Sequence, residues 1–449
     1  MAQLASIRVL PGGDDPARMI GVDDAREQIL AAFAPLPAVG MPIADSLGLV
    51  LATDVYAPGN VPPFANAAMD GFAVRAIDTV HASEDAPARL RVVGQAAAGH
   101  LPDRVVGPGD AIRIMTGAPV PAGADAVVRF EETDEATRPG GRGGFAGSAI
   151  AIYHAARPGA NIRLAGEDVR TGERVLVAGT RLRPAEIGLL ASIGRATVAV
   201  HRRPRVAILA TGDEVVPPGA ALGPGQIRDS NSAAVAALVR RTGGEPVGLG
   251  IARDTIEGVR AKLWAAAGAD LLVSTGGVSV GDYDLVKQVL CQEGRVTLWQ
   301  VRLKPGKPLA FGWIGGTPLV GLPGNPVAAM VAFEQFVRPA ILRLLGRTDL
   351  VIPTVLATLA DRVENRGGRR HFARVRVETT DRGYVAHLAG PQGAGVLTSL
   401  VRADGLLVVP ETVAVAEPGT TLPVQMIDWE PRKHAHRCAD LVAGRDARW

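Results

Sequence analysis

Residues 206–214 read Val-Ala-Ile-Leu-Ala-Thr-Gly-Asp-Glu, and this stretch decides the fold of the central part of the chain. The run 206–210 is wholly apolar, which is typical of a strand buried on both faces of a parallel sheet. Gly212 permits a sharp turn after the strand, so Asp213 is expected at the carboxyl edge of the sheet, where ligands of such sheets bind. A carboxylate there suits a divalent cation, but capping of the next element explains Asp213 equally well.

Apolar strands and amphipathic helices alternate along the next 130 residues. The pattern predicts strands over 246–251, 271–274 and 318–322 and helices over 232–241, 255–267, 283–290 and 327–345. Such alternation is typical of an α/β domain with three layers, in which helices cover both faces of a parallel-rich sheet.

Three loops of this predicted domain have the chemistry of anion sites. Residues 275–284 form a glycine-rich turn after a strand, which would bring backbone N–H groups close to a ligand. Residues 304–308, Lys-Pro-Gly-Lys-Pro, hold two ammonium groups near each other, and an anion would neutralise them. Residues 321–326 end a strand and open a helix with Asn325 as its N-cap. Each loop alone has a structural explanation, but three on one sheet edge indicate a ligand with several phosphates or oxyanions.

Short strands flank the α/β pattern on both sides. Segments 90–93, 111–114 and 126–130 predict a small β domain, and segments 354–359, 372–378, 384–388 and 405–409 predict a second β domain or barrel. A helix is expected over 22–33. The basic end of the chain, from residue 431, lacks periodicity and is expected to be disordered.

Length and composition limit the classes of protein that fit. A chain of 449 residues predicts three or four domains, with 47% hydrophobic and 21% charged residues as in soluble proteins. A net charge of +3 and 4% aromatic residues argue against nucleic-acid binding. Two distant cysteines favour a reducing cytoplasm. No leader-like or membrane-spanning stretch stands out. His434, His436 and Cys438 in the tail provide three possible metal ligands, whereas a closed zinc site needs four, so zinc binding is not expected there.

The motifs together resemble the molybdopterin molybdenumtransferase family, which contains bacterial MoeA and the gephyrin E domain. The resemblance runs from about Val22 to about Val424. It rests on these stretches: Pro62–Val74, Met115–Ala118, Gly166–Asp168, Pro184–Gly188, Thr211–Glu214, Asp229–Asn231, Gly276–Asp284, Lys304–Pro308 and Gly321–Pro326.

The resemblance implies an elongated α/β multidomain protein. Its parts would be an N-terminal scaffold (1–57 plus 151–183), an inserted small β domain (58–150), the α/β domain (184–346), a C-terminal β-barrel (347–430) and a disordered tail (431–449). It also implies a homodimer whose active sites lie between the α/β domain of one subunit and the inserted region of the other. Other molybdenum-cofactor enzymes would be further, transient partners.

The implied reaction inserts molybdate into adenylylated molybdopterin, with Mg²⁺ as the metal and AMP as a product. Residues fall into three implied groups. The acids around the metal and pyrophosphate would be Asp213, Asp70, Glu186 and Asp254. Asp213 and Asp70 would bind the metal. For Glu186 and Asp254, a helix cap or a surface ion pair is a comparable interpretation. The pterin and phosphates would meet Thr116, Ser274, Gly276, Gly277, Ser279, Asp282 and Asn325. Molybdate would contact Lys304, Lys307, Pro308, Arg374 and Ser399. For Arg374 and Ser399, a role on the barrel itself is the alternative to contact with molybdate.

Four alanines depart from the family pattern: Ala65 stands where Asp is frequent, and Ala67, Ala328 and Ala394 stand where Ser is frequent. Loss of hydroxyls beside anion loops would weaken molybdate binding, but the main acids and lysines are present. Two alternatives to the insertion enzyme stay open at this point. One is a molybdopterin adenylyltransferase, which uses a similar sheet and double-glycine loop, and the other is a non-catalytic scaffold of the gephyrin type.

Overall fold

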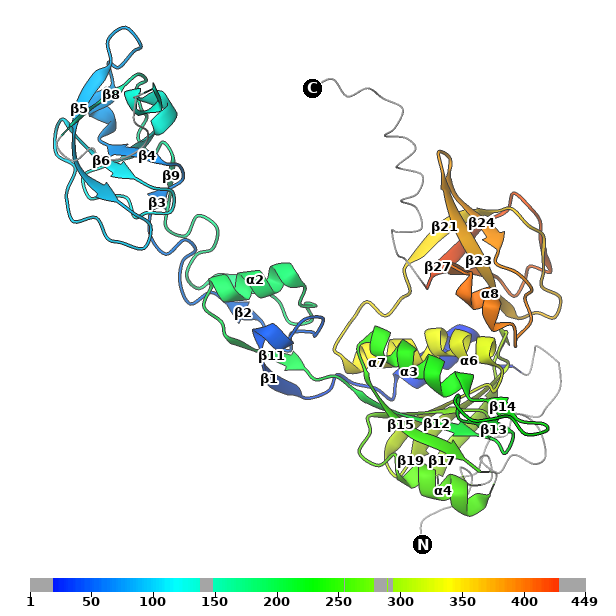
Figure 1. The fold of residues 1–449 in the computed structure, drawn as a ribbon. Helices are drawn as coiled ribbons and strands as arrows, with labels where there is room; N and C mark the ends of the chain where they lie inside the picture. Colours follow the sequence, from blue (N-terminus) through cyan, green and yellow to red (C-terminus); the bar gives the residue numbers. More distant parts are fainter. Residues whose placement is uncertain (1–18, 138–147, 254, 278–288, 290–293, 428–449) are drawn as a thin grey trace. The chain divides into compact units, whose positions relative to one another are not determined.

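The computed structural model describes residues 19–137, 148–253, 255–277, 289 and 294–427. The chain divides into two compact units (Figure 1). The smaller unit contains residues 40–47 and 53–198, and the larger unit contains residues 1–39, 48–52 and 199–449.

The smaller unit contains the predicted β domain. Its main sheet has the strand order β7-β4-β6-β5-β8, and only the pair β5–β6 is parallel. The strands are β4 (Gly71–Val74), β5 (Ala88–Ala96), β6 (Asp110–Ile114), β7 (Ala126–Arg129) and β8 (Ala149–Ile152). Alternate side chains of β4 enter two cores, with Phe72 and Val74 on one face of the sheet and Ala73 on the other.

Short elements make up the rest of the smaller unit. The pairs are β2 (Val55–Tyr56) with β10 (Arg174–Leu176), and β3 (Asn66–Ala67) with β9 (Ile162–Arg163). The strands β1 (Ala38–Pro42) and β11 (Thr197–His201), which also pair, run across the boundary between the units. Single turns of 3-10 helix are η2 (Ile43–Asp45), η3 (Ala76–Thr79), η4 (Phe130–Glu132) and η5 (Asp134–Thr137).

Two helices lie close to predicted domain boundaries. Helix α2 (Pro184–Ser192) contacts η2 in the smaller unit. Helix α1 (Val22–Leu30) belongs to the larger unit, where its buried Val22, Ala25 and Ile29 pack beside the last helices of the α/β domain. The boundaries given from the sequence stay predictions.

The α/β domain is built on a six-stranded sheet of order β15-β12-β16-β20-β19-β17. The strands are β12 (Arg205–Thr211), β15 (Glu245–Ala252), β16 (Leu271–Thr275), β17 (Gly294–Gln300), β19 (Pro308–Ile314) and β20 (Thr317–Leu322). The first four in spatial order are parallel, as predicted, whereas the antiparallel edge formed by β19 and β17 was not predicted. The sheet is therefore mixed but parallel-rich.

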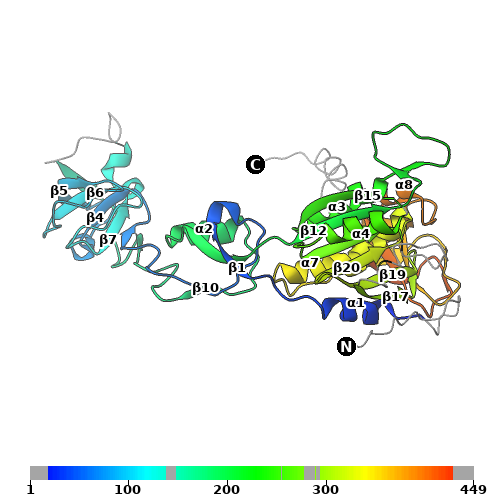
Figure 2. The same ribbon diagram turned by 90° about the horizontal axis from the view of Figure 1, so that it is seen from below.

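Helices cover both faces of this sheet (Figures 1 and 2). One face carries α3 (Ser230–Thr242), α6 (Pro326–Ala332) and α7 (Arg338–Leu344), and the other carries α4 (Ile256–Trp264). A π-helical turn, η6 (Phe333–Val337), joins α6 to α7, so the helix predicted over 327–345 is real but not uniform. The helix predicted over 283–290 lies almost wholly outside the described residues.

The C-terminal domain is a closed five-stranded barrel of order β23-β24-β21-β27-β25, and β23 also pairs with β25. The strands are β21 (Thr354–Leu359), β23 (Arg370–Thr380), β24 (Gly383–Leu388), β25 (Gly405–Val409) and β27 (Thr421–Met426), the last of which was not predicted. Around it lie α8 (Leu397–Val401) and the pair β22 (Val363–Glu364) and β26 (Val415–Ala416). The strand β18 (Leu303–Lys304) joins the barrel sheet through β23.

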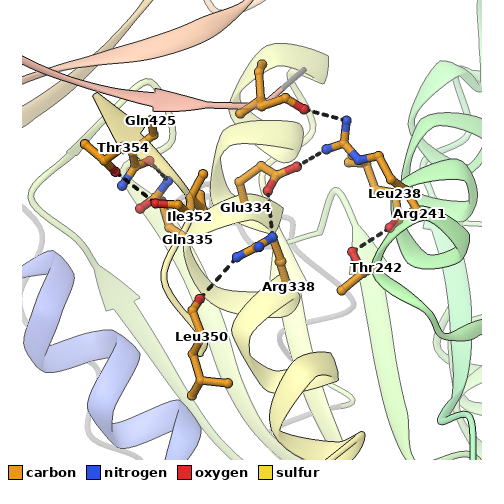
Figure 3. A network of polar contacts seen from close by, with 11 residues as sticks. Leu238, Arg241, Thr242, Glu334, Gln335, Arg338, Leu350, Ile352, Thr354 and Gln425 are labelled. Atoms are coloured by element: carbon orange, nitrogen blue, oxygen red, sulfur yellow. Dashed lines mark hydrogen bonds and ion pairs between the residues drawn. The ribbon is translucent and has the colours of Figure 1, made fainter. Parts of the chain in front are cut away.

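Polar contacts hold the barrel against the helices of the α/β domain (Figure 3). The buried Glu334 of η6 forms ion pairs with Arg241 of α3 and Arg338 of α7. Arg241 Nη1 also donates to the carbonyl of Ile427, at 2.9 Å, beyond the last barrel strand. The neighbouring Gln335 donates to Gln425 of β27 at 2.8 Å. Because an unpaired buried charge is costly, this network favours one position of the barrel on the α/β domain.

Candidate active site

The larger unit contains a cleft of about 1030 Å³ at the carboxyl ends of β12, β16 and β20. Its wall gathers five of the segments that carry the predicted motifs. They are Thr211, Gly212 and Glu214 at the end of β12, Asp229–Asn231 at the start of α3, Thr275–Gly277 at the end of β16, Lys304–Pro308, and Pro323–Pro326 after β20. The predicted convergence of these loops at one sheet edge is confirmed.

Glycines form the floor of the cleft. Gly276 and Gly277 have φ values of +85° and +67°, which a side chain would oppose. A Cβ on Gly324 would lie 3.8 Å from Gly276 Cα, so the loops after β16 and β20 approach each other closely. Asn231 Nδ2, at the start of α3, donates to the carbonyl of Gly324 at 2.7 Å. This floor lets a ligand approach the backbone of two strand ends.

Acidic side chains stand at the end of β12. Asp213 and Glu214 are both exposed, and Glu214 lines the cleft. The Glu214 carboxylate folds back over Gly212, since a Cβ there would lie 2.5 Å from its Oε2 atom. Asp229 is instead committed to capping α3, because its Oδ1 accepts from Ser232 N at 2.9 Å. Asp213 was predicted as the site acid and Glu214 was not, although the two are adjacent.

Three cationic side chains, Lys304, Lys307 and Arg369, also line the cleft and are together called its cationic wall. Partial burial and then the nearby charges of Arg369 and Arg374 lower the pKa of Lys304. Its Nζ donates to the carbonyl of Glu364 at 3.3 Å. Among the described residues, no acid forms an ion pair with Lys304 or Arg369, so this wall suits an anionic ligand.

Arg374 and Ser399 do not line the cleft, and their contact with molybdate stays a prediction. Both side chains are buried, Arg374 completely. Arg374 Nη2 donates to the carbonyls of Pro391 and Gly393 at 3.2 and 3.0 Å, and Nε donates to Ser399 Oγ at 3.1 Å. Burial lowers the pKa of Arg374 to about 10. The guanidinium therefore holds the loop whose Gln392 lines the cleft.

Asp70 and Thr116 meet each other in the smaller unit. Thr116 N and Oγ1 both donate to Asp70 Oδ1, each at 2.7 Å. These bonds join the turn before β4 to the turn after β6, two motifs that are far apart in the sequence. The structure thus pairs these two predicted site residues with each other.

Glu186 caps helix α2. Its carboxylate accepts from the backbone N–H of Arg183 at 2.9 Å and from the Arg183 guanidinium. The Arg183 side chain, more than any other group, lowers the pKa of Glu186 to about 2. This is the capping box that the alternative interpretation of Glu186 described, and Glu186 does not line the cleft.

The remaining predicted residues divide into three groups. Gly276, Gly277, Asn325 and Pro308 line the cleft. Ser274 is fully buried in β16 and does not line it. Asp254, Ser279 and Asp282 lie outside the described residues.

The cleft also contains residues that were not predicted from the sequence: Glu214, Asn231, Arg369, Gln392, and the pair Ile227 and Arg228 of β14 (Ile227–Arg228), which is parallel to β13 (Val215–Val216). Ala328 and Ala394, two of the departures from the family pattern, line it as well. Ala65 and Ala67 belong to the smaller unit, where Ala67 is buried. Glu214 and Asn231 lie within the motifs Thr211–Glu214 and Asp229–Asn231, so the sequence held a signal for these two.

Three family models match consecutive parts of the chain: the MoeA N-terminal region (domain I and II) over residues 20–194, the probable molybdopterin binding domain over 207–343, and the MoeA C-terminal region (domain IV) over 357–427. A Mycobacterium tuberculosis protein named molybdopterin molybdenumtransferase 2 is 40% identical, over 86% of this chain and 94% of its own length. The chain belongs to the MoeA family.

Other MoeA proteins are similar in sequence to this chain over most of their length. The molybdopterin molybdenumtransferase of Haemophilus influenzae is 34% identical over 91% of this chain and 98% of its own. A crystal structure of a MoeA protein from Pyrococcus horikosii matches with a TM-score of 0.76 and 37% identity, covering 92% of this chain and all of the other. The matches confirm the family predicted from the motifs.

The described residues contain no group of three or more His, Cys, Asp or Glu side chains arranged to bind a metal ion. No helix in the described part of the chain is both long enough and apolar enough to cross a bilayer.

Proposed function

We propose that the protein is a molybdopterin molybdenumtransferase, which inserts molybdate into adenylylated molybdopterin and releases AMP. The observation that supports this function is the cleft itself, where a glycine floor, the acid Glu214 and a cationic wall meet at one sheet edge, next to Asp213. Adenylylated molybdopterin carries a pyrophosphate, which suits backbone N–H donors. Molybdate is a tetrahedral dianion, which suits lysine and arginine.

The donor set at the end of β12 fits Mg²⁺ shared with a substrate. Asp213 and Glu214 provide two carboxylates, which are too few for a closed protein cage. Mg²⁺ is commonly held by one or two carboxylates together with substrate phosphates. We propose that these two residues hold the ion, which when bound would supply positive charge at the pyrophosphate. Asp70 stays a predicted metal ligand, and Asp254 and Asp282 stay predicted site residues.

The glycine floor and the cationic wall would bind different substrate groups. The N–H groups of the loops after β16 and β20 would hold phosphate oxygens on the glycine floor. Lys304, Lys307 and Arg369 would attract molybdate to the cationic wall. Such fixed charges orient both reactants and stabilise negative charge that develops on the departing AMP. No protein nucleophile is needed for this exchange.

An assay of molybdate-dependent AMP release tests the proposal. Asp213→Asn should lower the rate by about a hundredfold, because one of two carboxylates beside the pyrophosphate loses its charge. The matched control is Asp381→Asn, an exposed residue in a barrel turn, which should release AMP at the wild-type rate. Both variants should keep the wild-type unfolding temperature. An unchanged rate in Asp213→Asn would remove that residue from the mechanism.

Two assays separate the alternative functions. In the AMP-release assay a scaffold would release no AMP from adenylylated molybdopterin. In a second assay an adenylyltransferase would form adenylylated molybdopterin when given molybdopterin and ATP. The homodimer and the cytoplasmic location are proposals that rest on the resemblance and on the cysteine content, and light scattering of the purified chain tests the dimer.

A further inference from the structure

His371 is a buried histidine beside the cationic wall of the cleft. It lies on β23 and is the register partner of the cleft-lining Lys304 in the parallel β18–β23 ladder. Its side chain is on the same face of β23 as Ala373 and Val375, which belong to the barrel core. Only 2% of the residue is exposed. His371 therefore occupies the end of the barrel interior that adjoins Lys304.

Neither ring nitrogen of His371 has a hydrogen-bond partner among the described residues. Most buried polar atoms in folded proteins have a partner, so two unpaired atoms on one ring require an explanation. A packing role alone does not provide it, because an apolar side chain would fill the same space without the penalty of burying two polar atoms.

The charged groups around His371 are almost all positive. Burial, followed by the charges of Lys304, Arg374 and Arg369, lowers the pKa of His371 to about 3. The neighbour on β25 is Val409, which carries no charge. The nearby acids are engaged elsewhere: Glu364 is exposed and pairs with Arg362, and Asp23 and Glu411 pair with Arg370. The His371 ring is therefore expected to be neutral until an anion binds at the cationic wall.

We propose that His371 takes up a proton from solvent when a tetrahedral dianion binds against Lys304, so that oxyanion binding in the cleft is coupled to proton uptake. The dianion offsets the repulsion between an imidazolium and the three cations, which favours the charged ring. No bond to the anion forms or breaks at His371, whose role is to adjust the charge beside Lys304. The inference rests on the proposed function, because it needs an oxyanion in this cleft.

Calorimetric titration of the full chain with sodium molybdate tests the coupling. Measurements in two non-phosphate buffers of different ionisation enthalpy give the number of protons taken up. The wild type should take up roughly one proton near pH 6 and almost none near pH 8, because the coupling requires the bound dianion to raise the pKa of His371 from about 3 to between these two values. Its affinity should rise by up to about tenfold for each unit that the pH falls below the pKa of the bound state.

Two glutamine variants locate the proton. His371→Gln keeps a polar side chain but cannot become charged, so its uptake and the pH dependence of its affinity should be lost. His387→Gln is the matched control, because His387 lies on β24 of the same barrel and pairs with Glu378. This control should behave as the wild type. Thermal unfolding of each variant checks that the barrel is intact.

The outcomes distinguish this inference from the proposed function. Molybdate binding with equal proton uptake in the wild type and a folded His371→Gln would overturn the role of His371 and leave the function standing. Should His371→Gln fail to fold, the wild type alone decides, since an affinity that is constant from pH 6 to pH 8 overturns the coupling. A wild type that binds no molybdate overturns both.

Discussion

Arg374 is a single buried cation that holds a loop of the cleft in place. The family resemblance implies that it contacts molybdate, with a role on the barrel itself as the alternative. The structure instead buries the whole side chain and directs two of its nitrogens to the carbonyls of Pro391 and Gly393 and the hydroxyl of Ser399. Its effect on the ligand is therefore expected to pass through the loop that contains Gln392 and Ala394.

Arg374→Ala should destabilise the barrel by about 2–4 kcal/mol, because it leaves buried carbonyls without donors and opens a cavity. Hydrogen exchange of the β23 and β25 amides measures this loss. Arg376→Ala, an exposed neighbour on the same strand, is the control and should exchange as the wild type does. If Arg374→Ala kept full protection but lost molybdate binding, the guanidinium would have to reach the ligand directly.

At the scale of one element, α2 begins with a complete capping box between Arg183 and Glu186. Pro184 at the first position has no N–H to satisfy, which also favours this start. Capping of α2 is therefore a sufficient structural explanation for the Glu186 carboxylate, which the resemblance implies near the metal. The same arrangement fixes its charge, because Arg183 lowers the pKa of Glu186 to about 2.

Glu186→Ala should lower the free energy of opening of α2 by about 1 kcal/mol, which makes its amides exchange about fivefold faster. Glu186→Gln should lose less, because its amide oxygen still accepts from the backbone of Arg183. Since the folded-state pKa of Glu186 is lowered, the charge-dependent part of this stabilisation is present above about pH 4.5 and is lost as the pH falls towards 2. Loss of AMP release with unchanged exchange in α2 would instead support the catalytic assignment.

At the scale of the whole molecule, the chain is two compact units with separate cores. The cleft is built entirely within the larger unit, from the α/β domain and the barrel. The Asp70–Thr116 pair is built entirely within the smaller one. A defect in one core should therefore leave the other core folded.

Gly71→Ala tests this independence. A Cβ at Gly71 would lie 1.9 Å from the carbonyl oxygen of Val128, so β4 and β7 could not keep their pairing. The variant should lose about 3 kcal/mol or more from the smaller unit alone. Calorimetry should show one transition moved to lower temperature and the other unchanged, with Gly59→Ala, which meets nothing within 4 Å, as the control. A joint shift of both transitions would mean that the units unfold together.

The sequence was sufficient wherever the signal is local. The apolar run at 206–210, the glycines at 276 and 277 and the prolines at 323 and 326 each restrict the backbone over a few residues, so strand ends and loop types could be predicted. Parallel strands share one carboxyl edge, and this rule alone predicts that the anion loops lie together. The family resemblance then supplied the identity of the ligand.

Tertiary structure decided which side chains face the cleft. Arg374 lies on β23, which pairs with β25 at positions thirty or more residues further along the chain. The places of β17 and β19 in the sheet were likewise settled by their neighbours. The Lys304–Pro308 motif predicted two cations of the wall, whereas Arg369 was found only in the structure. The physical reason is that periodicity in a sequence records how a segment is buried but not what it is buried against.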